Sequence, residues 1–239
     1  SKTKTVDIFF VGSEGTDLDR GIYAFYFNVD NGEIIKKSFV KSLANPLAMN
    51  KNGRFMYLTY RNGTGRAQDG GIWQYACMEV QLGLAARVGN EGRTYIQTLL
   101  NKNSSYAYAI DYYNGEVVTV PIKTSKIIRV SKTVKLDGHS IDPVKQTESH
   151  PTFMTFTPDN TKLIVTDLGG DEVIFFTEGE KGELIKDEEL SFKLTPGSGR
   201  LKLVYSKNRK VAYILNSISS TIACYSVKHT KFTLIDEVM

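Results

Sequence analysis

Cysteine and histidine are scarce in this sequence, with two of the former and three of the latter among 239 residues. Cys77 and Cys224 stand far apart in apolar segments, which favours two buried free thiols in a reducing compartment over a disulfide. The histidines are scattered, and no cluster has the spacing of a metal site. We therefore expect neither a metal ion nor another cofactor.

Long apolar runs are also missing. No stretch of about 18 apolar residues is present to span a membrane. The basic start Ser1–Thr5 leads directly into the strand pattern Val6–Val11, without the features of a signal peptide. The net charge is only +4 and the lysines are spread along the chain, so neither a membrane nor a nucleic acid is an expected partner. These absences predict a cytoplasmic protein.

Three motifs of common enzymes are absent as well. The sequence has no Gly-x-Ser-x-Gly nucleophile elbow, no P-loop and no glycine-rich dinucleotide fingerprint. This argues against an acyl-enzyme intermediate on such an elbow and against nucleotide chemistry.

What the chain does contain is a repeat. Four segments share a polar turn followed by a short apolar strand that ends in tyrosine, aspartate or asparagine: residues 50–60, 101–111, 157–167 and 206–216. The matched turn positions Gly53, Ser104, Asn160 and Arg209 are separated by 51, 56 and 49 residues. That period is typical of β-propeller blades, so we predict one propeller domain over residues 1–239.

The strand patterns predict an all-β fold. Side chains alternate with period two, as in Ile22–Phe27 and Val117–Ile122, and Asn-Gly, Asp-Gly and Gly-Gly turns bound such strands. No segment repeats apolar residues with helical spacing. We predict antiparallel blades of four strands at about 47–93, 94–149, 150–199 and 200–239, preceded by an incomplete unit at 5–46 that lacks its first strand.

The last strand bears on ring closure. Closed propellers usually complete an open unit with the C-terminal strand, because an open sheet edge leaves backbone groups unpaired. Here Leu234–Met239 already forms the outer strand of its own blade, so no strand remains for that exchange. We therefore expect about five blades in this chain and a longer complete protein.

Six motifs occur in a fixed order along the chain: Val11–Ser13, Gly21–Phe27, Asn45-Pro46, Lys145–Pro151, Phe156–Asp159 and Asp167–Asp171. Together they resemble the lactonase family of seven-bladed β-propellers, which includes bacterial 6-phosphogluconolactonases and fungal carboxymuconate-lactonizing enzymes. The resemblance covers the whole chain, and its most specific part runs from Lys145 to Asp171. It implies seven blades in the complete protein, of which this chain holds the first five.

The resemblance also implies site residues. Opening a lactone with water requires a base for the water proton, a cationic or hydrogen-bonding group for the carbonyl oxygen, and anchors for an anionic substrate. His150 matches a family histidine and is the expected catalytic base. The expected substrate-binding residues, from the same motifs and the corner near residue 200, are Lys145, Gln146, Asp167, Asp171 and Arg200.

These residues also have structural interpretations, which remain open. His150 could cap a strand before Pro151, and Asp167 and Asp171 could bond to backbone groups at a strand corner. The pair Gly169-Gly170 is more simply a tight turn than a cradle for a ligand.

Four positions of the family pattern are altered. They are Lys145 in place of an arginine, Thr152 in place of a second histidine, Leu201 in place of an arginine and Ser217 in place of a glutamate. Lysine keeps the charge but loses the planar fork that suits carboxylate or phosphate. Arg200 and Lys202 flank the altered arginine position.

Three functions are therefore considered. The first is a hydrolase for an anionic sugar lactone such as 6-phosphogluconolactone, with His150 as base and Lys145 or Arg200 on the anion. The second is a muconate-type lactonizing enzyme, a cycloisomerase that would use the same residues. The third is a non-catalytic propeller that acts as a binding or interaction module, which the altered positions favour.

One acidic stretch stands outside these motifs. Thr177–Glu183 and Lys186–Glu189 carry alternating and then continuous charge. We interpret them as a solvated hairpin and sheet edge.

Overall fold

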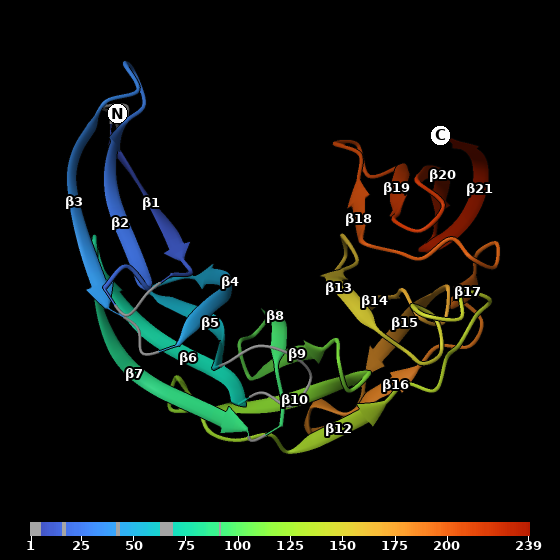
Figure 1. The fold of residues 1–239 in the computed structure, drawn as a ribbon, viewed down its shortest axis with the longest axis horizontal. Coiled ribbons are helices and arrows are strands. Elements are labelled where there is room, and N and C mark those ends of the chain that lie inside the picture. Colours follow the sequence, from blue (N-terminus) through green and yellow to red (C-terminus); the bar gives the residue numbers. More distant parts are fainter. Residues whose placement is uncertain (1–5, 16–17, 42–43, 63–68, 91) are drawn as a thin grey trace. The chain divides into compact units, whose positions relative to one another are not determined.

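The computed structural model describes residues 6–15, 18–41, 44–62, 69–90 and 92–239, which form five antiparallel β-sheets (Figure 1). Within these ranges the only helical segment is a short 3-10 turn, η1 (Glu180–Gly182). A helix long and apolar enough to cross a membrane is therefore not found in the described part of the chain. The all-β prediction is confirmed.

The first two sheets come from residues 6–90, and their strands pair in chain order. The first sheet has three strands: β1 (Val6–Ser13), β2 (Gly21–Asn28) and β3 (Ile34–Lys41). The second has four: β4 (Asn45–Asn52), β5 (Phe55–Asn62), β6 (Asp69–Met78) and β7 (Gln81–Asn90).

The remaining three sheets follow the same order, and two of them carry an additional short strand. The third contains β8 (Tyr95–Leu100), β9 (Tyr106–Asp111), β10 (Glu116–Lys123), β11 (Lys126–Ile127) and β12 (Lys132–Lys135). The fourth contains β13 (Pro151–Phe156), β14 (Lys162–Asp167), β15 (Glu172–Glu178), β16 (Leu184–Lys186) and β17 (Phe192–Lys193). The fifth contains β18 (Lys202–Tyr205), β19 (Val211–Asn216), β20 (Thr221–Lys228) and β21 (Lys231–Val238). Each predicted blade range therefore corresponds to one sheet, and the range 5–46 to the three-stranded one, except that β4 begins at Asn45, two residues before the predicted boundary.

The four matched repeat positions share one backbone conformation. Their φ angles are 58° at Gly53, 55° at Ser104, 59° at Asn160 and 61° at Arg209. These values lie in the left-handed region, which is uncommon for residues other than glycine. The next strand begins two residues later in every case, at β5, β9, β14 and β19. The repeat in the sequence is therefore a repeat of the same turn and strand.

The chain separates into two compact units, Ser1–Thr98 with Ile122–Arg129 and Leu99–Pro121 with Val130–Met239. In the first unit, buried Ile22 of β2 packs with Met56 and Leu58 of β5 and Tyr75 of β6. The division into two units does not test whether residues 1–239 form one domain, so that remains a prediction.

A buried glutamine explains why Ile122–Arg129 belongs to the first unit. Gln74 of β6 is completely buried and donates from Nε2 to the carbonyl oxygen of Ser125 at 2.7 Å. Its Oε1 accepts the backbone N–H of Ile127 at 2.9 Å. Both polar ends of one side chain therefore satisfy the backbone of the same hairpin, as buried polar groups require.

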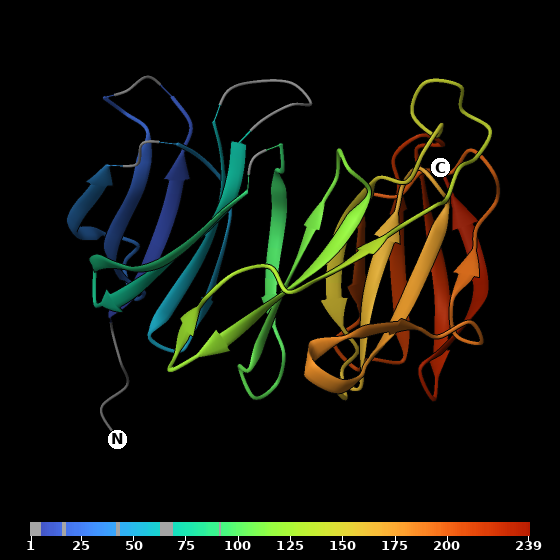
Figure 2. The same cartoon turned by 90° about the horizontal axis from the view of Figure 1, so that it is seen from below.

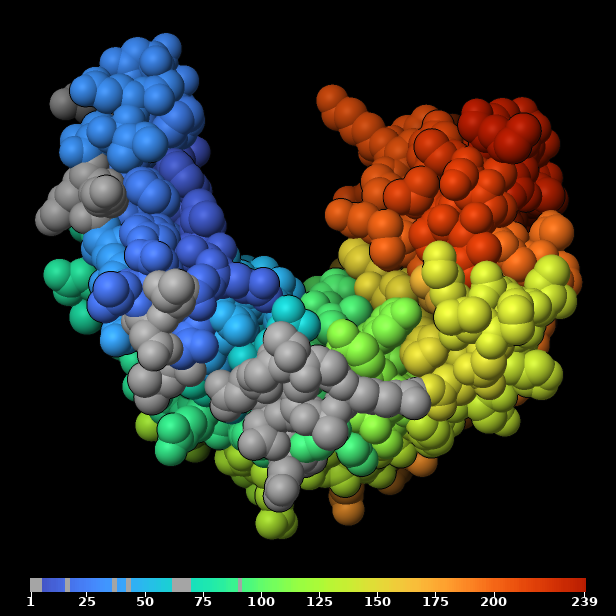
Figure 3. Space-filling view, viewed as in Figure 1, coloured from blue at the N-terminus to red at the C-terminus, as the bar shows by residue number. Residues whose placement is uncertain are grey.

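The second unit has a hydrophobic core between the fourth and fifth sheets. Ile164, Val173 and Phe175 of the fourth sheet form one buried cluster with Ile214, Tyr225 and other residues of the fifth. The strands of these two sheets run side by side in Figure 2, and their atoms are in continuous contact in Figure 3. This packing places the loops that precede β13 and β18 at neighbouring strand ends.

The two cysteines are free thiols, as predicted. Both are half-buried rather than fully buried. The apolar neighbours in the sequence indicated strands, but they did not show how completely each strand face is covered. Burial raises the pKa of the Cys77 thiol, and the charge of Lys51 opposes that effect.

Candidate functional site

The corner between β14 and β15 organises one end of the fourth sheet. It is a tight turn through Gly169 and Gly170, as the sequence predicted. A Cβ atom at Gly169 would lie 1.7 Å from the carbonyl oxygen of Glu148. Glycine at this position is therefore what allows the segment before β13 to approach the corner.

Asp167, at the start of this corner, holds the segment that leads into β13. Its carboxylate is completely buried and accepts the backbone N–H of His150 at 2.7 Å and that of Gly169 at 3.0 Å. It also accepts the hydroxyl of Ser149 at 2.7 Å. Asp167 therefore fixes the backbone position of His150.

Asp171, at the end of the corner, holds two segments at once. It accepts the hydroxyl of Ser140 at 2.5 Å, which belongs to the loop before β13. It also accepts the backbone N–H groups of Gly197 at 2.7 Å and Gly199 at 2.6 Å, in the loop before β18. One carboxylate thus ties the loops that carry His150 and Arg200 to the same corner.

Gln146 completes the attachment of the first loop. It is completely buried, and its Nε2 donates to the carbonyl oxygen of Leu168 at 2.9 Å while its Oε1 accepts the N–H of Asp142 at 3.1 Å. Lys145, the preceding residue, is exposed. Gln146 and Lys145, both predicted to bind substrate, therefore lie in different environments: Gln146 is inside the loop and Lys145 is in solvent.

Asp142 makes the local turn sensitive to acid. The backbone N–H groups of Lys145 and Val144, which donate to its carboxylate at 2.8 and 2.9 Å, lower the pKa of Asp142. Because the pKa is lowered in the folded protein, the ionised carboxylate stabilises the turn fully at pH values above the usual pKa of aspartate. This stabilisation is lost as the pH falls through the lowered pKa, below about pH 4.

We expect the amide NMR signals of Val144 and Lys145 to titrate together in that acidic range. Asp142→Asn keeps an oxygen acceptor but removes the ionisation, so the same signals should no longer titrate there. A midpoint above about pH 4 would contradict the assignment.

His150 stands directly before β13 with its side chain 8% exposed. Its Nδ1 lies 2.8 Å from the carbonyl oxygen of Tyr112, and its ring stacks on the Tyr112 ring with centroids 4.6 Å apart. A carbonyl oxygen only accepts, so Nδ1 carries the proton of the neutral imidazole. Nε2 is then the unprotonated nitrogen, and it has no hydrogen-bond partner in the described ranges. His150 is therefore held as a base with a free lone pair.

Arg200 is completely buried, and its three side-chain nitrogens have no hydrogen-bond partner among the residues described. Burial lowers the pKa of Arg200 to about 10, while the charges of Asp171 and Asp167 oppose that effect. The guanidinium still carries its charge at neutral pH. Arg200 therefore supplies the positive charge beneath the corner that holds these two buried carboxylates.

The altered position Thr152 has a structural role. Its hydroxyl donates to the carbonyl oxygen of Arg200 at 2.9 Å, and it lies 2.9 Å from the Thr166 hydroxyl. It therefore connects the loop before β18 with β13 and β14. Direct contact of a substrate with Gln146, Asp167, Asp171 or Arg200 stays a prediction.

Sequence reasoning missed Tyr112, Ser140 and Ser149. Tyr112 acts through a backbone carbonyl and a ring stack, neither of which has a sequence motif. Ser140 belongs to the long loop before β13, outside any motif, and Ser149 lies inside the Lys145–Pro151 motif, where the neighbouring His150 was the residue singled out. As for metals, no group of three or more histidine, cysteine, aspartate or glutamate side chains could hold an ion in the described ranges.

Comparison with known proteins identifies the family of the chain. The family model described as "Lactonase, 7-bladed beta-propeller" matches residues 8–239. A 6-phosphogluconolactonase of Formosa agariphila is 24% identical over 216 residues, covering 87% of this chain and 60% of that protein. A 6-phosphogluconolactonase of Bacillus subtilis is 20% identical over 218 residues, covering 89% of this chain and 60% of that protein.

Solved structures show the same fold. A periplasmic gluconolactonase of Pseudomonas aeruginosa superposes with a TM-score of 0.82 at 17% identity, covering 97% of this chain and 67% of that one. The sequence relatives are longer, since the chain spans 61% of an uncharacterised Lactococcus lactis protein that is 25% identical to it.

Proposed function

Because this chain belongs to the lactonase family of seven-bladed β-propellers, we propose that it is a hydrolase for an anionic sugar lactone, with 6-phosphogluconolactone as the first substrate to test. The observation that carries this proposal is the fixed tautomer of His150. Its Nδ1 faces the Tyr112 carbonyl oxygen, so the basic Nε2 is left without a partner in the described part of the chain. The names of the Formosa agariphila and Bacillus subtilis relatives support the substrate class.

The proposed reaction uses His150 twice. Nε2 takes a proton from water as the water oxygen bonds to the lactone carbonyl carbon, giving a tetrahedral oxyanion. The carbonyl re-forms as the ring C–O bond breaks, and the imidazolium returns its proton to the departing alkoxide. The product is the open-chain hydroxy acid. No net change occurs in the enzyme, and no cofactor is needed.

Two cations have proposed roles on the substrate's anionic group. Lys145 is exposed and belongs to the same loop as His150, so its ammonium is the accessible cation of the two. Arg200 is covered, and substrate contact would require its side chain to be uncovered. We therefore assign the phosphate of the substrate to Lys145 and a long-range electrostatic contribution to Arg200.

The substrate assignment is tested by initial hydrolysis rates of 6-phosphogluconolactone and of the unphosphorylated gluconolactone, each corrected for spontaneous hydrolysis. We expect a preference for the phosphorylated lactone that falls about fivefold in Lys145→Gln, since an exposed ion pair contributes up to about 1 kcal/mol. Lys207→Gln is the control, because Lys207 is exposed in the turn that follows β18.

Two results would contradict the proposal. Hydrolysis rates no higher than the spontaneous rates would exclude hydrolase activity on these lactones. Equal rates on both lactones would exclude a preference for the anionic substrate.

The muconate-type reaction would use the same residues, but no contact among the described residues favours it or a non-catalytic module. A cytoplasmic location stays a prediction.

A further inference from the structure

A cavity of about 420 Å³ lies at the opposite end of β13 from His150. His150 directly precedes β13, whereas Phe156, its last residue, lines the cavity. Six residues of extended chain span roughly 20 Å, so the cavity is separate from the candidate lactonase site. Its volume falls within the range of small-molecule pockets, roughly 300–1,000 Å³.

The floor of the cavity is aromatic and aliphatic. Tyr108 is completely buried and Leu163 and Leu184 nearly so, while Phe156 is half-buried. The rings of Tyr108 and Phe156 meet edge to face with centroids 6.4 Å apart. Because these side chains come from β9, β13, β14 and β16, the floor is supported by two adjacent sheets.

One wall is a fixed carboxylate. Glu178 accepts two hydrogen bonds from Asn101 Nδ2, at 2.9 and 3.1 Å, and one from the Tyr108 hydroxyl at 2.5 Å. Burial, and next the Glu178 carboxylate, raise the pKa of Tyr108 far above its usual range, so its hydroxyl remains a donor. A carboxylate has about four acceptor sites. Three hydrogen bonds therefore hold Glu178 in place and leave one site for a ligand.

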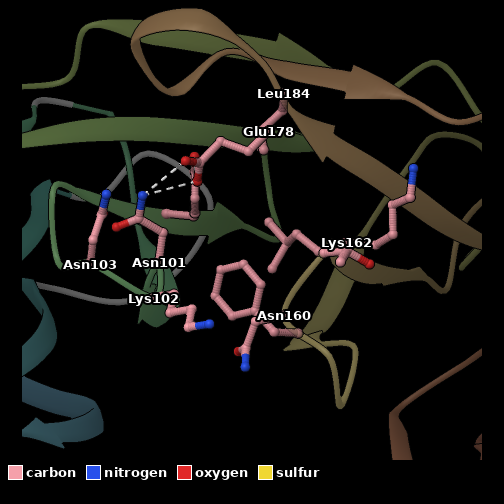
Figure 4. Close-up of a pocket in the computed structure, with 11 residues that line it drawn as sticks. Asn101, Lys102, Asn103, Asn160, Lys162, Glu178 and Leu184 are labelled. Carbon is pink, nitrogen blue, oxygen red and sulfur yellow. Dashed lines mark hydrogen bonds between the residues drawn. The ribbon is translucent and has the colours of Figure 1, made fainter.

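The rest of the rim offers donors. Asn160 has no side-chain hydrogen-bond partner in the described ranges, and Asn103 uses only its oxygen, which accepts the N–H and hydroxyl of Ser105. In Figure 4 the Lys102 side chain points toward Asn160. Lys162 is turned away and pairs with Asp187 at 2.8 Å. The rim thus offers the side-chain amides of Asn103 and Asn160. It also offers the ammonium of Lys102, which has no acidic partner in the described part of the chain.

We propose that this cavity is a carbohydrate-binding site that takes a pyranose ring and prefers a uronic acid. The C–H face of the sugar packs on Phe156, as an aromatic ring accepts an apolar face. Its hydroxyls donate to Glu178 and accept from Asn103 and Asn160, and the uronate pairs with Lys102. This site is independent of the proposed lactonase function, because its residues lie at the other end of the strands.

Saturation-transfer NMR on the whole protein, with methyl α-glucopyranoside and the corresponding glucuronoside, tests the site. We expect both to bind, the uronate about fivefold more tightly. Asn160→Gly should weaken both about fivefold, since it removes the amide and keeps the left-handed turn. Ser104→Gly is the matched control, because Ser104 is the equivalent left-handed residue and is not among the residues that line the cavity.

Further variants separate this site from the lactonase site. Phe156→Leu should weaken both sugars, and Lys102→Gln should remove the uronate preference. Binding should persist in His150→Ala, and its loss there would assign the sugar to the lactonase site and overturn the proposal. Absence of saturation transfer to either sugar, or unchanged binding in Asn160→Gly, would also overturn it.

Discussion

Replacing His150 by alanine is expected to lower kcat/KM for lactone hydrolysis about 10²- to 10⁴-fold, the usual contribution of a positioned general base. The variant removes Nε2, the nitrogen that the Tyr112 carbonyl leaves unprotonated. It keeps the hydrogen bond from the backbone N–H of residue 150 to Asp167, so the loop should retain its position. Lost stacking on Tyr112 should cost about 1 kcal/mol of stability.

The control for this experiment lies in the same loop. His139 is exposed, and His139→Ala should leave kcat/KM unchanged. His150→Gln adds a second comparison, because it retains a polar side chain of similar reach without a basic nitrogen. Equal rates for the wild type and His150→Ala, with both folded by circular dichroism, would exclude His150 as the base.

Replacing Gly169 by alanine is expected to destabilise the protein by about 4 kcal/mol or more, or to prevent folding. A Cβ atom would stand 1.7 Å from the carbonyl oxygen of Glu148 and 3.0 Å from the backbone nitrogen of His150. Because both contacts are to backbone, no side-chain rotation can relieve them. The corner would have to separate from the loop that Asp167 holds. Urea unfolding of the soluble protein, or the yield of soluble protein, measures the effect.

A second glycine in the same unit provides the comparison. A Cβ atom at Gly179 would have only side-chain atoms nearby, the nearest being the end of Ile185 at 2.9 Å, and the φ of −95° at Gly179 suits any residue. Gly179→Ala should therefore change the unfolding free energy by less than about 1 kcal/mol. Similar losses in the two variants would show that general glycine effects, rather than the close approach at Gly169, determine stability.

The repeat was the part of the fold that sequence could predict best. Turn chemistry is local, so the polar turns around Gly53, Ser104, Asn160 and Arg209 identified the start of four strands. The tight turn at Gly169-Gly170 was predictable for the same reason. Strand alternation then placed the remaining strands in the correct ranges to within two residues, the largest difference being the start of β4 at Asn45.

Contacts between distant segments were not predictable in this way. Glu178 belongs to a stretch interpreted as solvated, and although its side chain is exposed, it accepts hydrogen bonds from Asn101 and Tyr108 of the neighbouring sheet. The burial of Arg200 depends on how the fourth and fifth sheets pack. The sequence gives the chemistry of such residues, whereas tertiary packing decides which groups surround them.

The corner from Asp167 to Asp171 has a consequence for how this site can diversify. Most of the groups that its carboxylates hold are backbone N–H groups, at His150, Gly169, Gly197 and Gly199. Every residue except proline supplies such a group. Away from the glycines, whose Cβ positions are crowded or whose φ is positive, side chains on the attached loops can therefore be exchanged during evolution without removing the hydrogen bonds that hold the chain.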